Sequence, residues 1–530
     1  VTPKGRVAQT PHPAALGSAL TSPNITTDYS ESLIELITPP FGETWELLQY
    51  LTDLHHFVYR HLGEELLWAT SMPCALDGDA SIPIAEYGSS NIGRMKHVYR
   101  IGLGLRYGRV MQAISGVHFN YSFPDRLWPV LHEAWQAKSA GQAFVDEAYF
   151  ALLRNYRRHG WLILYLFGAS PALCKTFFKG REAPRNLQEL DAHTCYAPHA
   201  TSLRMSDLGY RNKNQAGVSV SVNSLQQYVR DLSTLIATPS AEYEKLGVKV
   251  DGEWRQLNAN ILQIENEYYS FIRPKRTTRP GERPTKALAR AGVEYVEMRS
   301  LDVGVFDPVG INQNKMRFLE AFAALCVLKD SPPIDRAGEH ELDENHVLVA
   351  VRGREPGLAL GLDGRPQDLR AWAAQLLEEM QGICELLDAG DPDRPYSSAL
   401  AVQQAKVADV TQTPSARLLR ELETERETFF HFALRMSRQH RDYFRDLYPP
   451  NDLQLEAFAR QAAGSLVEQG EVENGPGELQ SPRQLHIVRA RRRVARRRWS
   501  CRMPDTSIPV PLPASLIGGC VTGRRTSVTW

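Results

Sequence analysis

The stretch QAISGVHFNYSFP, residues 112–124, decides the fold class, because apolar and polar side chains alternate along it. The apolar positions share one face of an extended chain: Val117, Phe119, Tyr121 and Phe123. The polar positions share the other face: Gly116, His118, Asn120 and Ser122. Side chains of a β-strand alternate between two faces, so this stretch predicts a half-buried strand with a polar working face.

Two further segments are predicted to be strands. Residues 293–299 (VEYVEMR) alternate in the same way and place Glu297 and Arg299 on one face. Residues 24–38 end in the apolar run LIELI, which is a strand candidate.

Helical periodicity fills the chain between these strands. Residues 44–62 carry an apolar stripe that Thr44 is positioned to cap, and Asn451 is predicted to cap a late helix. The run WLILYLF (161–167) is a buried strand or helix. Other helices are expected at 140–157, 223–237, 314–329, 368–388 and 416–445. Strands in separate pieces among helices, without regular βαβ units, predict an α+β fold with a mostly antiparallel sheet.

The composition is that of a folded globular protein. Of 530 residues, 43% are hydrophobic and 23% are charged. The most apolar run, WLILYLF, is far shorter than the roughly 18–20 residues that cross a bilayer. No signal segment opens the chain, and the seven cysteines lack the spacing of a metal or redox motif. We therefore expect free thiols in a reducing, cytoplasmic environment.

The end of the chain differs in character. Residues 481–530 hold eleven arginines and one acidic residue, so the formal net charge of zero conceals a mildly acidic body. The preceding GEVENGPGELQSP resembles a linker, and the tail has no apolar periodicity. We expect residues 1–465 to form the folded domain and residues 466–530 to form a linker and a basic, disordered tail that adds nothing to the folded body.

Common nucleotide and hydrolase motifs are absent from the sequence. It contains no GxxxxGK[ST] loop, no HExxH and no GxSxG. The segment IGLGL (101–105) lacks the third glycine of a dinucleotide fingerprint.

Two carboxylates inside apolar strands are candidate ligands. Glu35 lies within LIELI, where a carboxylate is costly to bury unless it is paired or bound to a metal. Glu297 beside Arg299 could place a metal-binding oxygen next to a cation for phosphate. Both also fit a solvated strand face or an ion pair, and a lone histidine such as His118 is more often structural. On spacing alone, these structural interpretations are favoured.

Nine segments, in this order along the chain, resemble the glutamate–cysteine ligases of proteobacteria over about residues 1–465. They are HPAALGSALTSPNITTDYSESLIELITP, SSNIGRMKHVYRIGLGLRYG, MQAISGVHFNYSFP, LFGASPALC, ATSLRMSDLGY, LQIENEYYSFIRPKR, GVEYVEMRSLD, RGREPGLALG and SARLLREL.

The resemblance implies a fold of the glutamine synthetase and guanido kinase superfamily, with a curved, mostly antiparallel sheet cupping the site and helices outside. It implies ligation of the γ-carboxyl of L-glutamate to L-cysteine through γ-glutamyl phosphate, the first step of glutathione synthesis. The expected cofactors are ATP and Mg²⁺ or Mn²⁺, because cations must neutralise two anions that are brought together. Beyond these small molecules we expect a monomer that binds neither membrane nor nucleic acid.

The resemblance also implies roles for individual residues. The expected metal site is formed by Glu35, Glu297, Asp28 and His118. Arg204 matches the arginine that binds glutamate, where a planar guanidinium suits a carboxylate. The arginines near the transferred phosphate are matched by Arg100 and Arg299. The expected pocket for the cysteine side chain is formed by Tyr99, Leu103, Tyr210 and Tyr269.

The family pattern begins with a strand of the form Gly-x-Glu-x-Glu, whose glutamates are metal ligands. Val1 aligns with the end of that motif, so this N-terminal strand is missing from these 530 residues. We expect little ligase activity from this chain, and recovery when the upstream segment is restored.

Two alternatives stay open. A relative in the same superfamily could join glutamate to another amine, which a substrate panel would reveal, although the tyrosines of the pocket favour cysteine. A nucleic-acid-binding protein would use the Arg-rich tail and would lose salt-sensitive binding when 481–530 are deleted.

Overall fold

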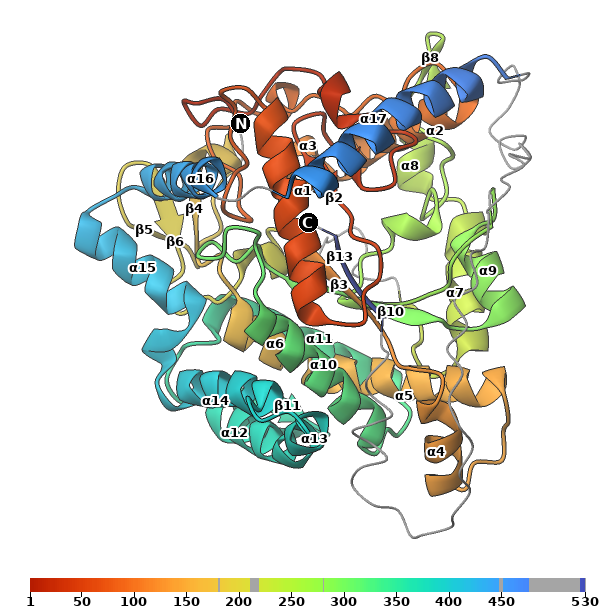
Figure 1. The fold of residues 1–530 in the computed structure, drawn as a ribbon, viewed down its shortest axis with the longest axis vertical. Helices are drawn as coiled ribbons and strands as arrows, with labels where there is room; N and C mark the ends of the chain where they lie inside the picture. Colours follow the sequence, from red (N-terminus) through yellow and green to blue (C-terminus); the bar gives the residue numbers. More distant parts are fainter. Residues whose placement is uncertain (180–181, 210–218, 280, 448–450, 476–524, 530) are drawn as a thin grey trace.

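The largest sheet has four antiparallel strands in the order β13-β3-β10-β9 (Figure 1). The structure, a computed structural model, describes all residues except 180–181, 210–218, 280, 448–450, 476–524 and 530. The strands of the sheet are β3 (Val117–Ser122), β9 (Ile272–Lys275), β10 (Tyr295–Leu301) and β13 (Arg525–Thr529). The mixture of helices with a mostly antiparallel sheet agrees with the predicted α+β class.

The register of the sheet gathers its polar residues on one face. Asn120 of β3 and Arg273 of β9 both lie opposite Glu297 of β10. The other face of β3 is fully buried, with Val117, Phe119 and Tyr121 all 0% exposed. The alternation predicted for 112–124 and 293–299 is therefore confirmed, although residues Arg109–Gln112 form a short helix, α3.

The strand predicted at the apolar run LIELI is confirmed, and a second strand before it was not predicted. The segment forms a hairpin of β1 (Ile25–Thr27) and β2 (Ile34–Leu36), with Thr26 opposite Glu35. The Asp28 backbone amide donates to the Leu33 carbonyl and closes the turn between the two strands.

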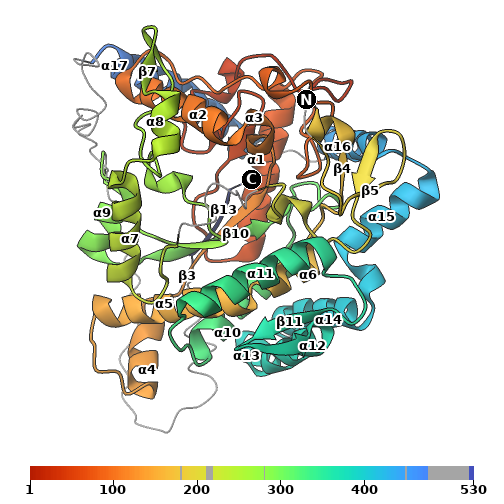
Figure 2. The ribbon, with the colours of Figure 1, turned by 180° about the vertical axis from the view of Figure 1, so that it is seen from behind.

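Helices surround the sheet. α5 (Gln142–His159) packs against α10 (Gln313–Leu328), and α6 (Trp161–Phe167) packs against α11 (Arg336–Arg352) and β10 (Figure 2). α17 (Asp452–Glu473) crosses α1 (Thr44–His61) on the other side of the molecule (Figure 1). The core lies between these helices and the apolar face of the sheet.

The remaining elements show where helical periodicity was enough and where it was not. The helix predicted at 368–388 breaks at Met380, and the one at 416–445 breaks at Arg426, whose φ is 51°. The other helices are α2 (Asn91–Tyr107), α4 (Leu127–Ala134), α7 (Leu225–Ala237), α8 (Ala241–Leu246), α9 (Pro284–Ala291), α12 (Leu369–Glu379), α13 (Gln381–Leu387), α14 (Pro395–Ala408), α15 (Pro414–Glu425) and α16 (Phe429–Asp446). The small strands are β4 (Ala172–Cys174), β5 (Gln188–Glu189), β6 (Thr194–Tyr196), β7 (Lys249–Val250), β8 (Glu253–Trp254), β11 (Ala359–Leu362) and β12 (Arg365–Asp368).

The predicted boundary at residue 466 needs correction. Asn451 caps α17 as predicted, but the helix continues to Glu473. The Glu473 carboxylate accepts a hydrogen bond from the Ser89 amide at 2.9 Å, which holds this last turn against the body. Residues Arg525–Thr529 also join the sheet as β13, along the edge of β3. Most of the predicted disordered tail, including the Arg-rich residues 489–502, lies outside the described residues.

The expectation of free thiols is wrong for one pair of cysteines. Cys74 and Cys174 form a disulfide, with their Cα atoms 5.4 Å apart. They are separated by 100 residues in sequence, so no local spacing could reveal the pair.

None of the helices in the described part of the chain is long and apolar enough to cross a membrane.

Candidate functional site

Glu297 lies at the centre of the polar face of the sheet. One of its carboxylate oxygens is 3.0 Å from Arg299 Nη1 and 3.2 Å from Lys275 Nζ on the neighbouring strand β9. Burial acts to raise the pKa of Glu297, but Lys275 and Arg299 hold that pKa well below its usual range. The sheet therefore presents an ionised carboxylate surrounded by cations.

His118 borders this cluster from β3. Its Nδ1 lies 3.3 Å from Arg299 Nη1 and 4.0 Å from a Glu297 carboxylate oxygen. Burial, and then the charge of Arg299, keep the pKa of His118 well below its usual range. The imidazole is therefore neutral at neutral pH, which leaves a ring nitrogen able to act as a ligand or acceptor.

Arg204 lies at the far end of β10. It is 2% exposed, and its Nη2 donates to the backbone carbonyl of Arg299 at 2.9 Å. A Cβ placed on Gly116 would overlap the guanidinium. The absence of a side chain at Gly116 is therefore what leaves room for Arg204 beside the sheet.

Asp302 holds the loop that carries Arg204. This buried carboxylate accepts hydrogen bonds from the Ala169 amide (2.8 Å), the Ser170 hydroxyl (2.7 Å) and the Ser202 hydroxyl (2.8 Å). Its Oδ1 also lies 3.7 Å from Arg204 Nη1. Asp302 thus ties two loop segments, 169–170 and 202–204, to the end of β10 and restrains the Arg204 guanidinium.

Glu35 approaches the site from the β1–β2 hairpin. Burial and the negative charge of Asp28 raise the pKa of Glu35 to about 7, although Arg100 and Lys96 on α2 act in the opposite direction. Arg100 donates to the backbone carbonyl of Asp28, so it is anchored beside this pair of carboxylates. The charge of Glu297 also raises the pKa of Glu35, so the two glutamates lie within electrostatic range.

The four predicted metal ligands border a common region without forming a complete ligand set. Asp28, Glu35 and His118 line one cavity of about 100 Å³, together with Gly116. Glu297 is instead balanced by protein cations. Within the described ranges, no group of three or more His, Cys, Asp and Glu side chains is arranged to hold a metal ion.

Three of the four predicted cysteine-pocket residues lie together. Tyr99 and Leu103 are one turn apart on α2, and Tyr269 lies on the segment before β9. All three pack against the same apolar cluster. Gln112 donates from Nε2 to the Tyr269 hydroxyl at 2.9 Å and fixes that ring. Tyr210, the fourth, lies outside the described residues.

Several residues of this site were not predicted. Arg273 and Lys275 add two cations to the polar face, and the alternation of basic residues in IRPK (272–275) is the signal that could have revealed them. Lys96 beside Glu35 and Gln112 beside Tyr269 lie in segments that resemble the family. Asp302 had no local signal, because its partners come from distant segments.

Comparison with known proteins identifies the family. The family described as glutamate-cysteine ligase matches residues 1–349. The glutamate–cysteine ligase of Pseudomonas putida strain W619 is 52% identical over 473 residues, which cover 89% of this chain and 90% of that protein. The corresponding protein of Alcanivorax borkumensis is 50% identical, over 88% of this chain and 91% of that protein.

A solved structure agrees with the sequence comparisons. The glutamate–cysteine ligase of Francisella tularensis, determined in complex with AMP, matches with a TM-score of 0.85 and 36% identity. The match covers 92% of this chain and 95% of that chain. A bifunctional glutathione synthetase from Pasteurella multocida shares the fold, with a TM-score of 0.69 and 23% identity. By its sequence and its fold, the chain belongs to the glutamate–cysteine ligase family.

Proposed function

We propose that this chain uses ATP to join the γ-carboxyl of L-glutamate to the amino group of L-cysteine, giving γ-glutamylcysteine, the first product of glutathione synthesis. The observation that carries the proposal is the polar face of the sheet, where Arg299 and Lys275 surround Glu297 and Arg204 donates to the Arg299 carbonyl. Tyr99, Leu103 and Tyr269, the expected cysteine-pocket residues, pack together in one apolar cluster. The positive charges of the arginine and lysine side chains suit two anionic substrates, and apolar neighbours suit the thiol side chain of cysteine.

Glutamate is held by Arg204 in this proposal. A guanidinium offers a planar fork of donors that matches a carboxylate. Its burial excludes competing water, and Asp302 on one side and the Arg299 carbonyl on the other restrict its orientation. The substrate's γ-carboxylate then faces the cations of β9 and β10.

The transferred phosphate is held by Arg100 and Arg299, and we add Lys275 and Arg273 to this group. A γ-carboxylate oxygen attacks the γ-phosphorus of ATP, and ADP leaves with the electrons of the broken P–O bond. The cysteine amine then attacks the acyl carbon of γ-glutamyl phosphate, phosphate leaves, and the amine loses a proton. The cations stabilise the charge on the transferred group, which is the main requirement of phosphoryl transfer.

A divalent cation, Mg²⁺ or Mn²⁺, would be held beside the nucleotide in this proposal. Asp28 and Glu35 are the carboxylates best suited to hold such a cation, because burial and Asp28 raise the pKa of Glu35 to about 7 even with Arg100 and Lys96 nearby, and both line the same cavity. When bound, the cation would supply positive charge to the phosphates. The described residues do not form a complete ligand set on their own.

Release of ADP tests the proposed function. With ATP, Mg²⁺ and glutamate present, ADP release is expected to be higher with cysteine than without it, and higher with cysteine than with alanine, serine or glycine. Equal release with and without cysteine, or a clear preference for another amine, would contradict the proposed reaction.

A further inference from the structure

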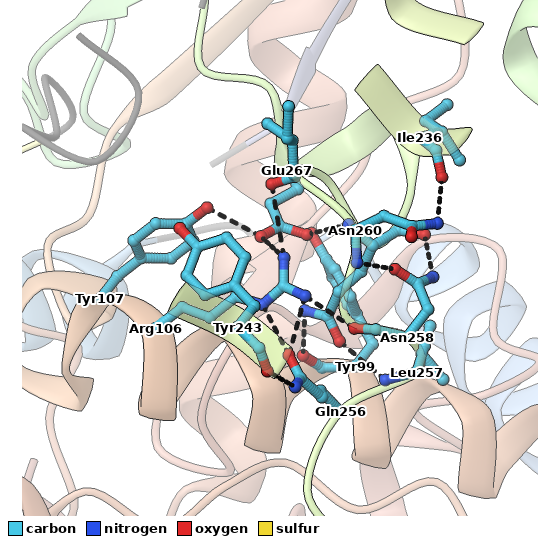
Figure 3. A network of polar contacts seen from close by, with 12 residues as sticks. Tyr99, Arg106, Tyr107, Ile236, Tyr243, Gln256, Leu257, Asn258, Asn260 and Glu267 are labelled. Atoms are coloured by element: carbon cyan, nitrogen blue, oxygen red, sulfur yellow. Dashed lines mark hydrogen bonds and ion pairs between the residues drawn. The ribbon is translucent and has the colours of Figure 1, made fainter. Parts of the chain in front are cut away.

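A fully buried ion pair lies just behind the proposed cysteine pocket. Arg106 Nη1 on α2 is 2.8 Å from a Glu267 carboxylate oxygen, and both side chains are 0% exposed (Figure 3). Neither group can therefore touch a substrate in the pocket. Any influence of this pair on the reaction must act through the elements that it joins.

The pair joins helix α2 to the segment 256–267. Arg106 donates from Nε and Nη2 to the Gln256 side-chain oxygen at 3.0 and 2.8 Å, and from Nη2 to the Asn258 carbonyl at 2.7 Å. Its guanidinium also lies over the ring of Tyr243, 4.0 Å from the centroid. One planar group thus fixes both the distance and the orientation between the two elements (Figure 3).

These two elements carry the two walls of the pocket. Tyr99 and Leu103 precede Arg106 on α2, while Tyr269 lies two residues after Glu267. Tyr107 connects the walls directly: its hydroxyl donates to Glu267 at 2.8 Å and its ring packs edge-on against Tyr269, with centroids 6.2 Å apart.

A second connection runs through Gln263. The backbone amide of Gln263 donates to the second carboxylate oxygen of Glu267 at 2.6 Å. Its side-chain Nε2 donates to the backbone carbonyl of Tyr99 at 3.3 Å. Gly102 lies so close to this side chain that an added Cβ would overlap it. Helix α2 and the segment 256–267 are therefore packed too closely at Gly102 to accommodate even one additional methyl group.

We propose that the buried Arg106–Glu267 pair is a positioning device that sets the width of the cysteine pocket, and so the preference of the enzyme for the acceptor amino acid. This rests on the proposed function. Buried ion pairs of this kind are a poor source of stability, because desolvation offsets their attraction, whereas their directional hydrogen bonds fix geometry. A small pocket discriminates between side chains that differ by one group only when its walls are held firmly.

The test compares Glu267→Gln with the control Glu379→Gln, which lies in a partly exposed ion pair. The control removes the same charge from an ion pair with Lys329 (2.6 Å) between α10 and α12. For each protein, KM is measured for cysteine, glutamate and ATP. The ratio of kcat/KM for cysteine to that for L-2-aminobutyrate, in which a methyl group replaces the thiol, is measured as well.

Glu267→Gln is expected to raise the cysteine KM about five-fold or more and to change the cysteine preference about three-fold. The KM values for glutamate and ATP should stay within about two-fold, and the control should match the wild type. Equal changes in all three KM values, or a lower melting temperature with unchanged preference, would overturn the proposal.

Tyr107→Phe is the second variant, because it removes one hydrogen bond to Glu267 and leaves the ion pair intact. It should shift the preference in the same direction by a smaller factor even where Glu267→Gln fails to fold, and an unchanged preference would count against the proposal. Failure of the proposed function itself would look different, because the wild type would then release no ADP with glutamate and cysteine.

Discussion

The site has two glutamates in apolar strands, and their surroundings are opposite. Glu297 on β10 lies between Lys275 and Arg299, which keep its pKa well below the usual range despite burial. Glu35 on β2 has Asp28 as its neighbour, and burial together with that second carboxylate raises its pKa to about 7.

The difference follows from which strands surround each residue. Strands β9 and β10 pair in a register that places basic residues beside Glu297, with Arg273 directly opposite it. The β1–β2 hairpin offers Glu35 only Thr26 across the ladder. On the side of β9 and β10, the charge of Glu297 is therefore already neutralised by protein cations, which suits an anionic substrate. On the hairpin side, an added cation would stabilise the ionised form of Glu35.

Glu297→Gln should have the largest effect, because it removes the charge that Lys275 and Arg299 surround. We expect turnover to fall by at least roughly 30-fold, corresponding to about 2 kcal/mol, as for truncation of a buried charge pair. Steady-state kinetics at saturating substrates measures this. Glu282→Gln, at a partly exposed ion pair with Arg290, is the control, and its turnover should be unchanged. Near-normal turnover of Glu297→Gln would show that the cluster of Glu297, Lys275 and Arg299 does not contribute to the reaction.

Arg204→Lys should come next. Lysine keeps the charge and loses the planar fork, so the glutamate KM should rise about ten-fold, as expected for a contact of roughly 1.5–3 kcal/mol. The cysteine KM should change much less. A similar rise in both constants would place Arg204 away from the glutamate carboxylate.

Gly116→Ala should produce a smaller change of the same kind. The new methyl group would overlap the Arg204 guanidinium, which cannot retreat freely because it is bonded to the Arg299 carbonyl. We expect the glutamate KM to rise about three-fold or more. Gly382→Ala, which meets nothing within 4 Å, is the matched control. An unchanged KM would mean that Arg204 acts from a different position when substrate is bound.

Glu35→Gln should have the smallest effect, visible in stability. Since the pKa of Glu35 is raised from 4.5 in the unfolded chain to about 7 in the folded one, its contribution to stability is present below about pH 4.5 and lost as the pH rises through 7. The variant should therefore match the wild type near pH 5 and melt roughly 1–3 °C higher at pH 8. Adding Mg²⁺ and ATP should shrink that gap, because a cation favours the ionised wild type. A gap that is constant from pH 5 to pH 8 would remove the proposed contrast between the two glutamates.

The sequence predicted the elements whose pattern is local. The alternation in 112–124 and 293–299 gave β3 and β10 with their polar face, and the apolar stripe of 44–62 gave α1. The run LIELI gave β2, but its partner β1 (Ile25–Thr27) was missed because three residues are too short to show a periodic pattern. The extension of α17 to Glu473 was missed because Gly470 and its polar neighbours resemble a linker, although the helix is held by a tertiary contact to Ser89.

The same division applies to the site. The resemblance supplied residues by position, and Glu297, His118, Arg299 and Arg204 of these lie at the polar face of the sheet. The resemblance could not reveal the Cys74–Cys174 disulfide, the hydrogen bonds to Asp302 or the Arg106–Glu267 ion pair. Each of these joins segments that are far apart along the chain. Such contacts depend on the packing of the whole molecule, which no local pattern encodes.

The most direct test of the central claim follows an oxygen atom. Glutamate labelled with ¹⁸O in its γ-carboxylate is supplied with ATP, Mg²⁺ and cysteine, and the released phosphate is analysed by mass spectrometry. Activation as γ-glutamyl phosphate predicts one ¹⁸O atom in the phosphate for each molecule of γ-glutamylcysteine formed, and no such phosphate when glutamate is omitted. Unlabelled phosphate released together with γ-glutamylcysteine would contradict the account.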